Sequence, residues 1–191
     1  TKAAREQFLE DKSSFLRSVI RCVHWLCMEN VDMLKLRILV QLVQAQAGCS
    51  TGDLPYANAS RCREFVMSLS AVIKSRVWKD ILASPAVSVL IDESTDVSQS
   101  ENMIVYIIYM KDGTLIAKYV GLVHVSEVDA DSITDTVLSF LAENGLDLGK
   151  MAGFCSDGAS VMTGWKNGVA AQLKKLNPFM LTIHCIAHRL A

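Results

Sequence analysis

The chain lacks several features that would assign a protein to a class at once. None of its 191 residues belong to an apolar run approaching the roughly 18 residues that span a bilayer, so we expect no membrane partner. Residues 1–12 are charged and contain no secretory apolar core. Acidic and basic residues nearly cancel, to a formal net charge of −1, which disfavours a strongly basic nucleic-acid module but leaves local basic patches open.

The sequence also lacks a Cys-x-x-Cys pair, although it contains six cysteines, at positions 22, 27, 49, 62, 155 and 185. This dispersion favours free thiols in a reducing compartment over a disulfide framework. For Cys22, His24 and Cys27, which fall around one predicted helix, buried packing is the default interpretation. Trp25 and Trp78 are likewise predicted to lie in the core.

What is present is apolar: 51% of the residues are hydrophobic, enough for a sizeable core. Apolar residues recur at helical spacing up to about residue 84, so residues 1–84 are predicted to form a helical segment. Asp32 and Ser60 are the expected N-caps of its second and third helices. Because the chain starts at Thr1 and stops at Ala191 within a predicted helix, we expect it to be a piece of a longer protein.

At Pro85 the spacing of apolar residues changes from helical to continuous or alternating, as in strands. Residues 85–191 are therefore predicted to form a second domain. Lys111-Asp112-Gly113 is a hairpin signal, and Asp129 or Asp131 caps a helix. The expected strands cover residues 87–91, 103–110, 114–125, 151–155 and 179–183, and the expected helices cover residues 131–143, 169–176 and 184–191.

Asp92 and Asp157 each follow an apolar strand. A right-handed crossover through residues 131–143 pairs the fourth strand with the first, which places the two aspartates roughly 5 Å apart at their backbones. Such convergent carboxylates attract a hard divalent cation. An ordinary turn-forming role for each aspartate is the alternative. The resulting fold is α/β: a ribonuclease-H-like mixed five-stranded sheet flanked by helices and preceded by the helical segment.

Three motifs carry a family resemblance: LIDESTD at residues 90–96, GFCSDGASVMTG at 153–164 and IHCIAHRLA at 183–191. Together with residues 25–30 and 167–171, they closely resemble hAT-superfamily transposases, most strongly the vertebrate, host-retained type found in zinc-finger fusion proteins. The resemblance covers nearly the whole chain.

This resemblance implies a three-acid site for DNA cleavage and strand transfer, with Asp92 as the first acid and Asp157 as the second. A glutamate supplies the third acid, after a large helical insertion, so this chain ends before it and holds an incomplete site. The implied cofactor is a pair of Mg²⁺ or Mn²⁺ ions, with Asp92 bridging both and Asp157 holding one. Whether the chain is an enzyme stays open, and we expect no activity from this fragment alone.

Two further groups of residues carry candidate roles. Helical spacing would present the side chains of His184, Cys185 and His188 together. Zinc is not expected there, because the chain has no second cluster of ligands. We expect the three residues to have a structural role or to support the acids. A modest basic face is either ordinary helix surface or a contact to DNA phosphates: Lys166, Lys174 and Lys175. Beside it, Trp165 is expected to be packed or to lie at an interface.

Three functions fit these observations. The first is a host-retained, nuclear transposase-like domain that serves DNA or protein interaction or transcriptional regulation. The second is the first half of an active metal-dependent transposase, and the third is a protein-interaction module without a DNA role. The resemblance implies that self-association depends on a C-terminal region outside this chain. The sequence does not specify the DNA target, the accessory domains or the oligomeric state.

Overall fold

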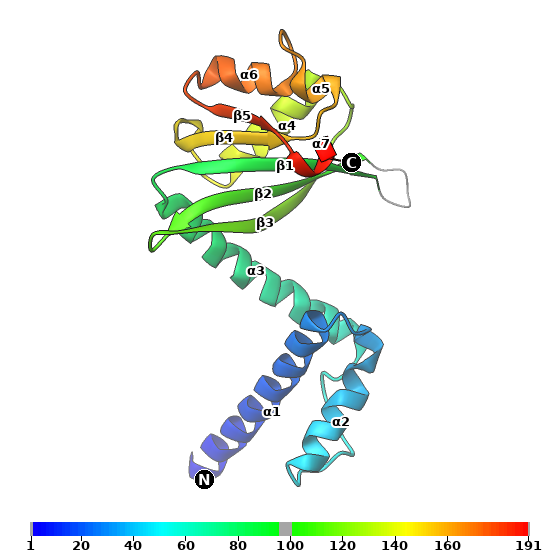
Figure 1. Cartoon of the computed structure of the whole chain (residues 1–191). Helices are drawn as coiled ribbons and strands as arrows, with labels where there is room; N and C mark the ends of the chain where they lie inside the picture. Colours follow the sequence, from blue (N-terminus) through cyan, green and yellow to red (C-terminus); the bar gives the residue numbers. More distant parts are fainter. Residues whose placement is uncertain (1, 96–100, 191) are drawn as a thin grey trace. The chain divides into compact units, whose positions relative to one another are not determined.

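The structure is a computed structural model that describes residues 2–95 and 101–190 (Figure 1). Contacts divide the chain into two compact units, residues 1–73 and 74–191. The sequence placed the boundary after residue 84, at the end of helix α3 (Ala59–Ala83). The division falls earlier because Trp78 and Ile81, near the end of α3, are buried in the core of the second unit. No helix in the described ranges has the length and apolarity to cross a membrane.

The first unit is helical. It contains α1 (Lys2–Met28), the 3-10 turn η1 (Met33–Lys35), α2 (Leu36–Gln46) and the first part of α3. The side-chain carboxylate of Asp32 accepts a hydrogen bond of 2.8 Å from the backbone N–H of Leu34, which confirms the predicted cap. The buried residues of its core are Val19, Cys22, Val23, Leu26, Leu36, Val40, Leu54, Ala57 and Cys62.

Two predictions for this unit were wrong. Trp25 is 48% exposed, and His24 and Cys27 are exposed as well. The buried stripe of α1 runs through Val19, Cys22, Val23 and Leu26, and the helical repeat turns the neighbouring positions outward.

The second wrong prediction concerns the start of α3. The helix begins at Ala59, and the side-chain oxygen of Asn58 accepts a hydrogen bond of 2.9 Å from the backbone N–H of Arg61. Ser60 therefore lies inside the helix. Asn and Ser are about equally good N-caps, so composition alone did not separate the two positions.

The second unit contains a five-stranded sheet with the order β3-β2-β1-β4-β5 (Figure 1). Strands β1, β2 and β3 pair antiparallel, whereas β1–β4 and β4–β5 pair parallel. This mixed sheet with flanking helices confirms the predicted ribonuclease-H-like fold class. The strands are β1 (Val87–Thr95), β2 (Glu101–Lys111), β3 (Thr114–His124), β4 (Met151–Ser156) and β5 (Leu181–His184).

Local signals in the second unit account for its turns. Asp112 and Gly113 both have positive φ, 50° and 76°, as the two central residues of a type I′ hairpin require. Asp129 caps helix α4 (Ala130–Glu143) by accepting hydrogen bonds of 2.9 Å from the backbone N–H groups of Asp131 and Ser132. Of the two predicted caps, Asp129 is therefore the correct one.

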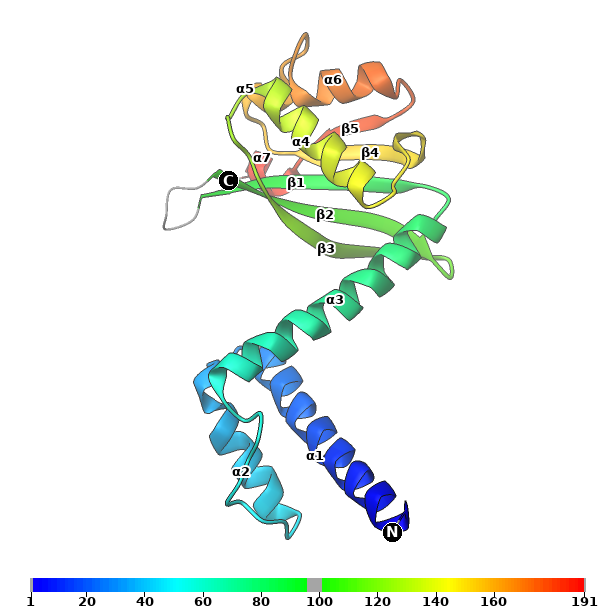
Figure 2. The same ribbon diagram turned by 180° about the vertical axis from the view of Figure 1, so that it is seen from behind.

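The two faces of the sheet differ. One face packs under α4, which crosses it in Figure 2, and the core on that side also includes residues of α5 (Ser160–Thr163) and α6 (Val169–Leu176). Its buried strand residues alternate with residues on the opposite, open face, where Tyr106 and Tyr119 meet edge to face at 5.8 Å between ring centroids. The short helix α7 (Ile186–Leu190) lies at the carboxyl end of β1, on the near side in Figure 1 and the far side in Figure 2.

The sheet core generates a prediction with an internal control. Phe154 on β4 is 2% exposed, whereas Phe179 is 94% exposed. Phe154→Ala should lower the free energy of unfolding by about 3–5 kcal/mol, because it removes a buried ring and leaves a cavity. Phe179→Ala should change it by less than about 0.5 kcal/mol. Urea denaturation followed by circular dichroism measures both, and equal effects would contradict the packing described here.

Candidate acidic site at the carboxyl ends of β1 and β4

The two sequence-predicted acids lie at the same end of neighbouring parallel strands. The β1–β4 ladder pairs Leu90 with Cys155. Asp92 and Asp157 each lie two residues beyond this pair, so both emerge at the same end of the sheet. Asp157 accepts a hydrogen bond of 3.1 Å from the backbone N–H of Ala159, which holds its carboxylate in the turn after β4.

One boundary differs from the prediction and affects Asp92. The sequence ended the first strand before Asp92, but β1 continues to Thr95 and pairs with β2 as far as Glu101. Asp92 is therefore a strand residue, opposite Ile104, whereas Asp157 belongs to a turn. The ladder to β2 fixes the backbone of the first acid, because antiparallel hydrogen bonds continue past it.

Negative charge accumulates at this end of the sheet. The pKa of Glu93 is raised, first by desolvation and then by the charges of Asp157, Glu101 and Asp92. In the sequence Glu93 belongs to the first motif, which the resemblance interprets only through Asp92. Glu101 was not considered, because only the β1–β2 register shows that it lies near Glu93.

An imidazole faces the first acid. Nε2 of His188, on α7, lies 3.8 Å from Oδ1 of Asp92. The pKa of His188 is raised, first by a side-chain hydrogen bond with Cys185 and further by the charges of Asp92 and Asp157. The two paired side chains are 46% and 55% exposed, so water screens the pair and its contribution to stability is small.

The predicted helical trio divides into separate positions. Helix α7 begins at Ile186, not at residue 184, so His184 belongs to β5 and does not share a helix face with His188. The His184 ring instead packs against Gly158, where an added Cβ would collide with it. Its Nε2 atom is buried and has no hydrogen-bond partner among the described residues. His184 thus packs against the turn that follows Asp157, whereas His188 faces Asp92.

Cys185 connects this histidine to a second thiol. Its pKa is lowered by hydrogen bonds from the backbone N–H of His188, then from the His188 side chain and the backbone N–H of Ala187. The pKa of the Cys155 thiol is raised, chiefly by burial and further by the neighbouring Cys185. The sequence interpreted Cys155 only as one of six free thiols. Its position two residues before Asp157 was the signal that it adjoins the acids.

The basic face is formed by residues of α6 and of the segment before it. Lys174 and Lys175 are exposed in the last turn of α6, and the ammonium group of Lys166 lies 4.8 Å above the ring of Trp165. Trp165 itself is exposed and not packed in the core. None of the three lysines is among the groups that shift the pKa of Glu93 or His188 in the described part of the chain.

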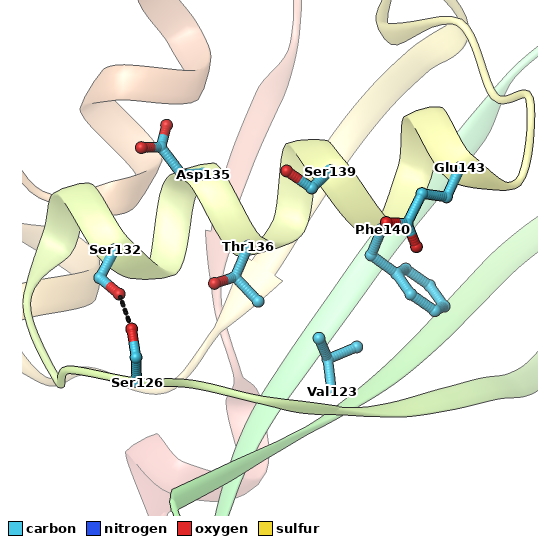
Figure 3. A pocket seen from close by; sticks show the side chains of 8 residues that line it. All are labelled: Val123, Ser126, Ser132, Asp135, Thr136, Ser139, Phe140 and Glu143. Carbon is cyan, nitrogen blue, oxygen red and sulfur yellow. Dashed lines mark hydrogen bonds between the residues drawn. The ribbon is translucent and has the colours of Figure 1, made fainter.

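A separate groove runs along α4 and is lined mainly by hydroxyl and carboxylate side chains (Figure 3). Ser126 and Ser132 are hydrogen-bonded across one end at 3.2 Å, and Phe140 and Val123 form its apolar floor. The groove lies on the helix-covered side of the sheet and includes neither Asp92 nor Asp157. It is therefore not part of the acidic site.

The donor set determines which metal the residues fit. In residues 2–95 and 101–190, no three His, Cys, Asp or Glu side chains are gathered as a metal-binding group. Mg²⁺ is commonly held by only one or two carboxylates and keeps several waters, so Asp92 and Asp157 are suitable ligands for it. A zinc site needs a closed set of three or four protein ligands.

The strand order and the paired acids define an RNase-like domain. A family model described as DUF4371, ZMYM1/FAM200, RNase-like domain matches residues 53–168, which is more than half of the chain. The chain belongs to this family. The matched segment contains both aspartates and four of the five strands, whereas β5 and α7 lie beyond it.

The environment of His188 leads to a testable pH dependence. Because its pKa is raised in the folded state, the stabilising contacts of the imidazolium are fully present below the ordinary histidine pKa and are lost as the pH rises through the raised value. In an NMR titration of the ring protons, Cys185→Ala and Asp92→Asn should each lower the pKa of His188. Asp135→Asn, an exposed carboxylate on α4, should leave it unchanged. A wild-type pKa at or below the ordinary value would contradict the geometry.

Proposed function

We propose that this RNase-like domain derives from an hAT-superfamily transposase and serves, in a host-retained nuclear protein, in DNA or protein interaction or in transcriptional regulation. The observation that carries the proposal is the parallel β1–β4 pairing, which brings Asp92 and Asp157 to the same end of one sheet. Membership of the ZMYM1/FAM200 RNase-like family supports it.

In this proposal Asp92 and Asp157 are the first two acids of the ancestral site and hold Mg²⁺ or Mn²⁺. The raised pKa of Glu93 supports cation binding, because a cation relieves the repulsion among neighbouring carboxylates. Such ions activate a water or a 3′-hydroxyl and stabilise the leaving oxygen. The backbone of Asp92 is held by the ladder to β2, and that of Asp157 by the capped turn, so the carboxylates are positioned before a ligand arrives.

DNA contact is proposed for Lys166, Lys174 and Lys175. All three are exposed, and ammonium groups bind phosphate oxygens without reading sequence. The exposed ring of Trp165 beside Lys166 adds an apolar surface at the same place. Because the whole chain is close to neutral, this contact is proposed to position the domain on DNA and not to provide strong affinity.

A protein-interaction function is the second candidate, and the open face of the sheet favours it. Large apolar side chains of β2, β3 and β5 are exposed there, and exposed apolar patches commonly mark interaction sites. These residues are Tyr106, Tyr119, Leu122, Leu181 and Ile183. An active transposase is the third candidate, and a glutamate supplied from further along a full-length chain would favour it.

Metal binding is the direct test of the acids. At a Mg²⁺ or Mn²⁺ concentration tenfold above Kd, the wild-type chain should gain about 1.4 kcal/mol of stability, a rise in Tm of about 5 °C. Asp92→Asn and Asp157→Asn should abolish this increment, while Asp135→Asn, which retains both acids, should keep it. The increment is compared within each variant, because removing a carboxylate also relieves repulsion. Equal increments in all four proteins would exclude a metal role for the pair.

DNA binding separates the first candidate from the second. If Lys174 contacts a phosphate, Lys174→Ala should reduce the slope of log K against log salt by roughly 0.9 for duplex DNA. Lys118→Ala, at an exposed position on β3, is the matched control and should leave the slope unchanged. Fluorescence anisotropy with a labelled duplex at several salt concentrations measures the slope. Absent or salt-independent binding would favour the protein-interaction module.

A further inference from the structure

One large aromatic side chain of the second unit stands almost entirely in water. Trp165 lies in the segment between α5 and α6 and is 83% exposed, although its indole is one of the largest apolar groups that a protein can bury. This segment projects beyond α6 at the top of both views (Figures 1 and 2). Single exposed apolar residues are common, so the surroundings of the ring decide what it can bind.

The backbone that carries Trp165 is a closed turn. The backbone N–H of Gly168 donates a hydrogen bond of 2.8 Å to the carbonyl oxygen of Gly164, and the N–H of Gly164 donates one of 2.9 Å to Ser160. The two glycines approach so closely that a Cβ on Gly168 would collide with the backbone nitrogen of Gly164. The ring is therefore presented on a fixed backbone, and a ligand that binds it loses little free energy in ordering the loop.

A cation lies over one face of the ring. The ammonium nitrogen of Lys166 is 4.8 Å from the ring centroid of Trp165. Because the Trp165 side chain remains 83% exposed, the other face of the ring is open to a ligand. A flat group that stacks on this face brings its own substituents close to the ammonium group. The pair therefore favours a ligand that combines an aromatic ring with negative charge.

The surrounding sequence favours a polyanion as this ligand. Residues 158–191 contain four lysines and arginines and no aspartate or glutamate, whereas the whole chain has a net charge of −1. Helix α6 has eight residues, a length of about 12 Å, so exposed Lys174 in its last turn can reach the same strand as Lys166. Lys175 shares a groove with two carboxylates of α4 and contributes less. Lys166 and Lys174 are therefore the two cations that a phosphate backbone can follow.

We propose that Trp165 stacks on an unpaired base of single-stranded DNA while Lys166 holds a phosphate of the same strand. The bases of a duplex are already stacked on one another, whereas every unpaired base offers a free π-face to an aromatic side chain. An apolar pocket on a protein partner would also cover the ring, but it would use neither the cation nor the acid-free segment around it. The inference rests on the proposed contact with DNA and names the form of DNA that this surface takes.

A short stretch of chain ties the stacking position to the acidic site. Trp165 follows Asp157 by eight residues, four of which form α5. Helical residues rise about 1.5 Å each and extended residues span at most about 3.6 Å, so the two Cα atoms lie within roughly 20 Å of each other. A strand held at Trp165 can therefore extend to the end of the sheet where Asp92 and Asp157 lie. The stacked base would fix the position of the strand relative to the acids.

Fluorescence anisotropy with two probes tests the proposal: a labelled strand of about 12 nucleotides, and the same strand annealed to its complement. The quantity compared is the ratio of the association constants for the single strand and the duplex at one salt concentration. Trp165→Ala should lower this ratio about tenfold, because it removes the stacking of one base. Trp165→Phe, which keeps an aromatic face, should retain most of the ratio. Trp25→Ala, at an exposed tryptophan of the first unit, is the matched control and should leave the ratio unchanged.

The cation and the outcomes complete the test. Lys166→Ala should reduce the slope of log K against log salt by roughly 0.7 for the single strand, while Lys118→Ala should not change it. A ratio that is the same in Trp165→Ala and in the wild type would overturn the stacking proposal and assign the ring to a protein contact. Duplex binding that still depends on Lys174 would then leave the proposed DNA contact standing. Absence of binding to both probes would overturn both proposals.

Discussion

The parallel pairing of β4 with β1 is the interaction on which the architecture of the second unit and its acidic site depend. It joins a meander of three antiparallel strands to the βαβ half of the sheet, and it is the only register among the described strands that brings the two acid-bearing segments together. Small residues allow the two strands to pack closely where Gly153 pairs with Ser88. An added Cβ on Gly153 would lie 2.6 Å from the Ser88 hydroxyl oxygen. A glycine is needed there because a neighbouring side chain fills the space over its backbone.

Three motifs that are far apart in the sequence meet at one end of this sheet. The first supplies Asp92 and Glu93, the second supplies Asp157, and the third supplies His188. Burial and then the neighbouring carboxylates raise the pKa of Glu93, whereas the hydrogen bond with Cys185 and then the opposite charges of the acids raise the pKa of His188. A site with this charge pattern is suited to bind cations, as the proposed transposase ancestry requires. The His184 ring against Gly158 couples the turn after Asp157 to the end of β5.

The sequence was sufficient for the fold because its strongest signals are periodic and local. The change of period at Pro85, the Asp112-Gly113 turn and the Asp129 cap all act over a few residues, and the handedness of the crossover then determines the strand order. The placement of Asp92 and Asp157 at the ends of neighbouring strands was predictable from that order alone.

The remaining differences between the predictions from the sequence and the structure depend on contacts between distant segments. Trp25 has the composition of a core residue but faces outward on α1. The start of α7 depends on Cys185 continuing the β4–β5 hydrogen bonding, and the roles of Glu101 and Cys155 depend on strand register. Register follows from the pairing of whole strands, which the composition of a short window does not encode.

The order of the strands also has a consequence for how the chain acquires its structure. The β1–β2 and β2–β3 ladders connect neighbours along the chain, whereas Val87 and Met151 pair across more than sixty intervening residues. Closing so long a loop carries an entropic penalty before any contact repays it, and such non-local topology slows folding. During synthesis the meander can assemble first, while the junction that carries both aspartates must wait for β4 to emerge. The acidic end of the sheet therefore forms after the meander.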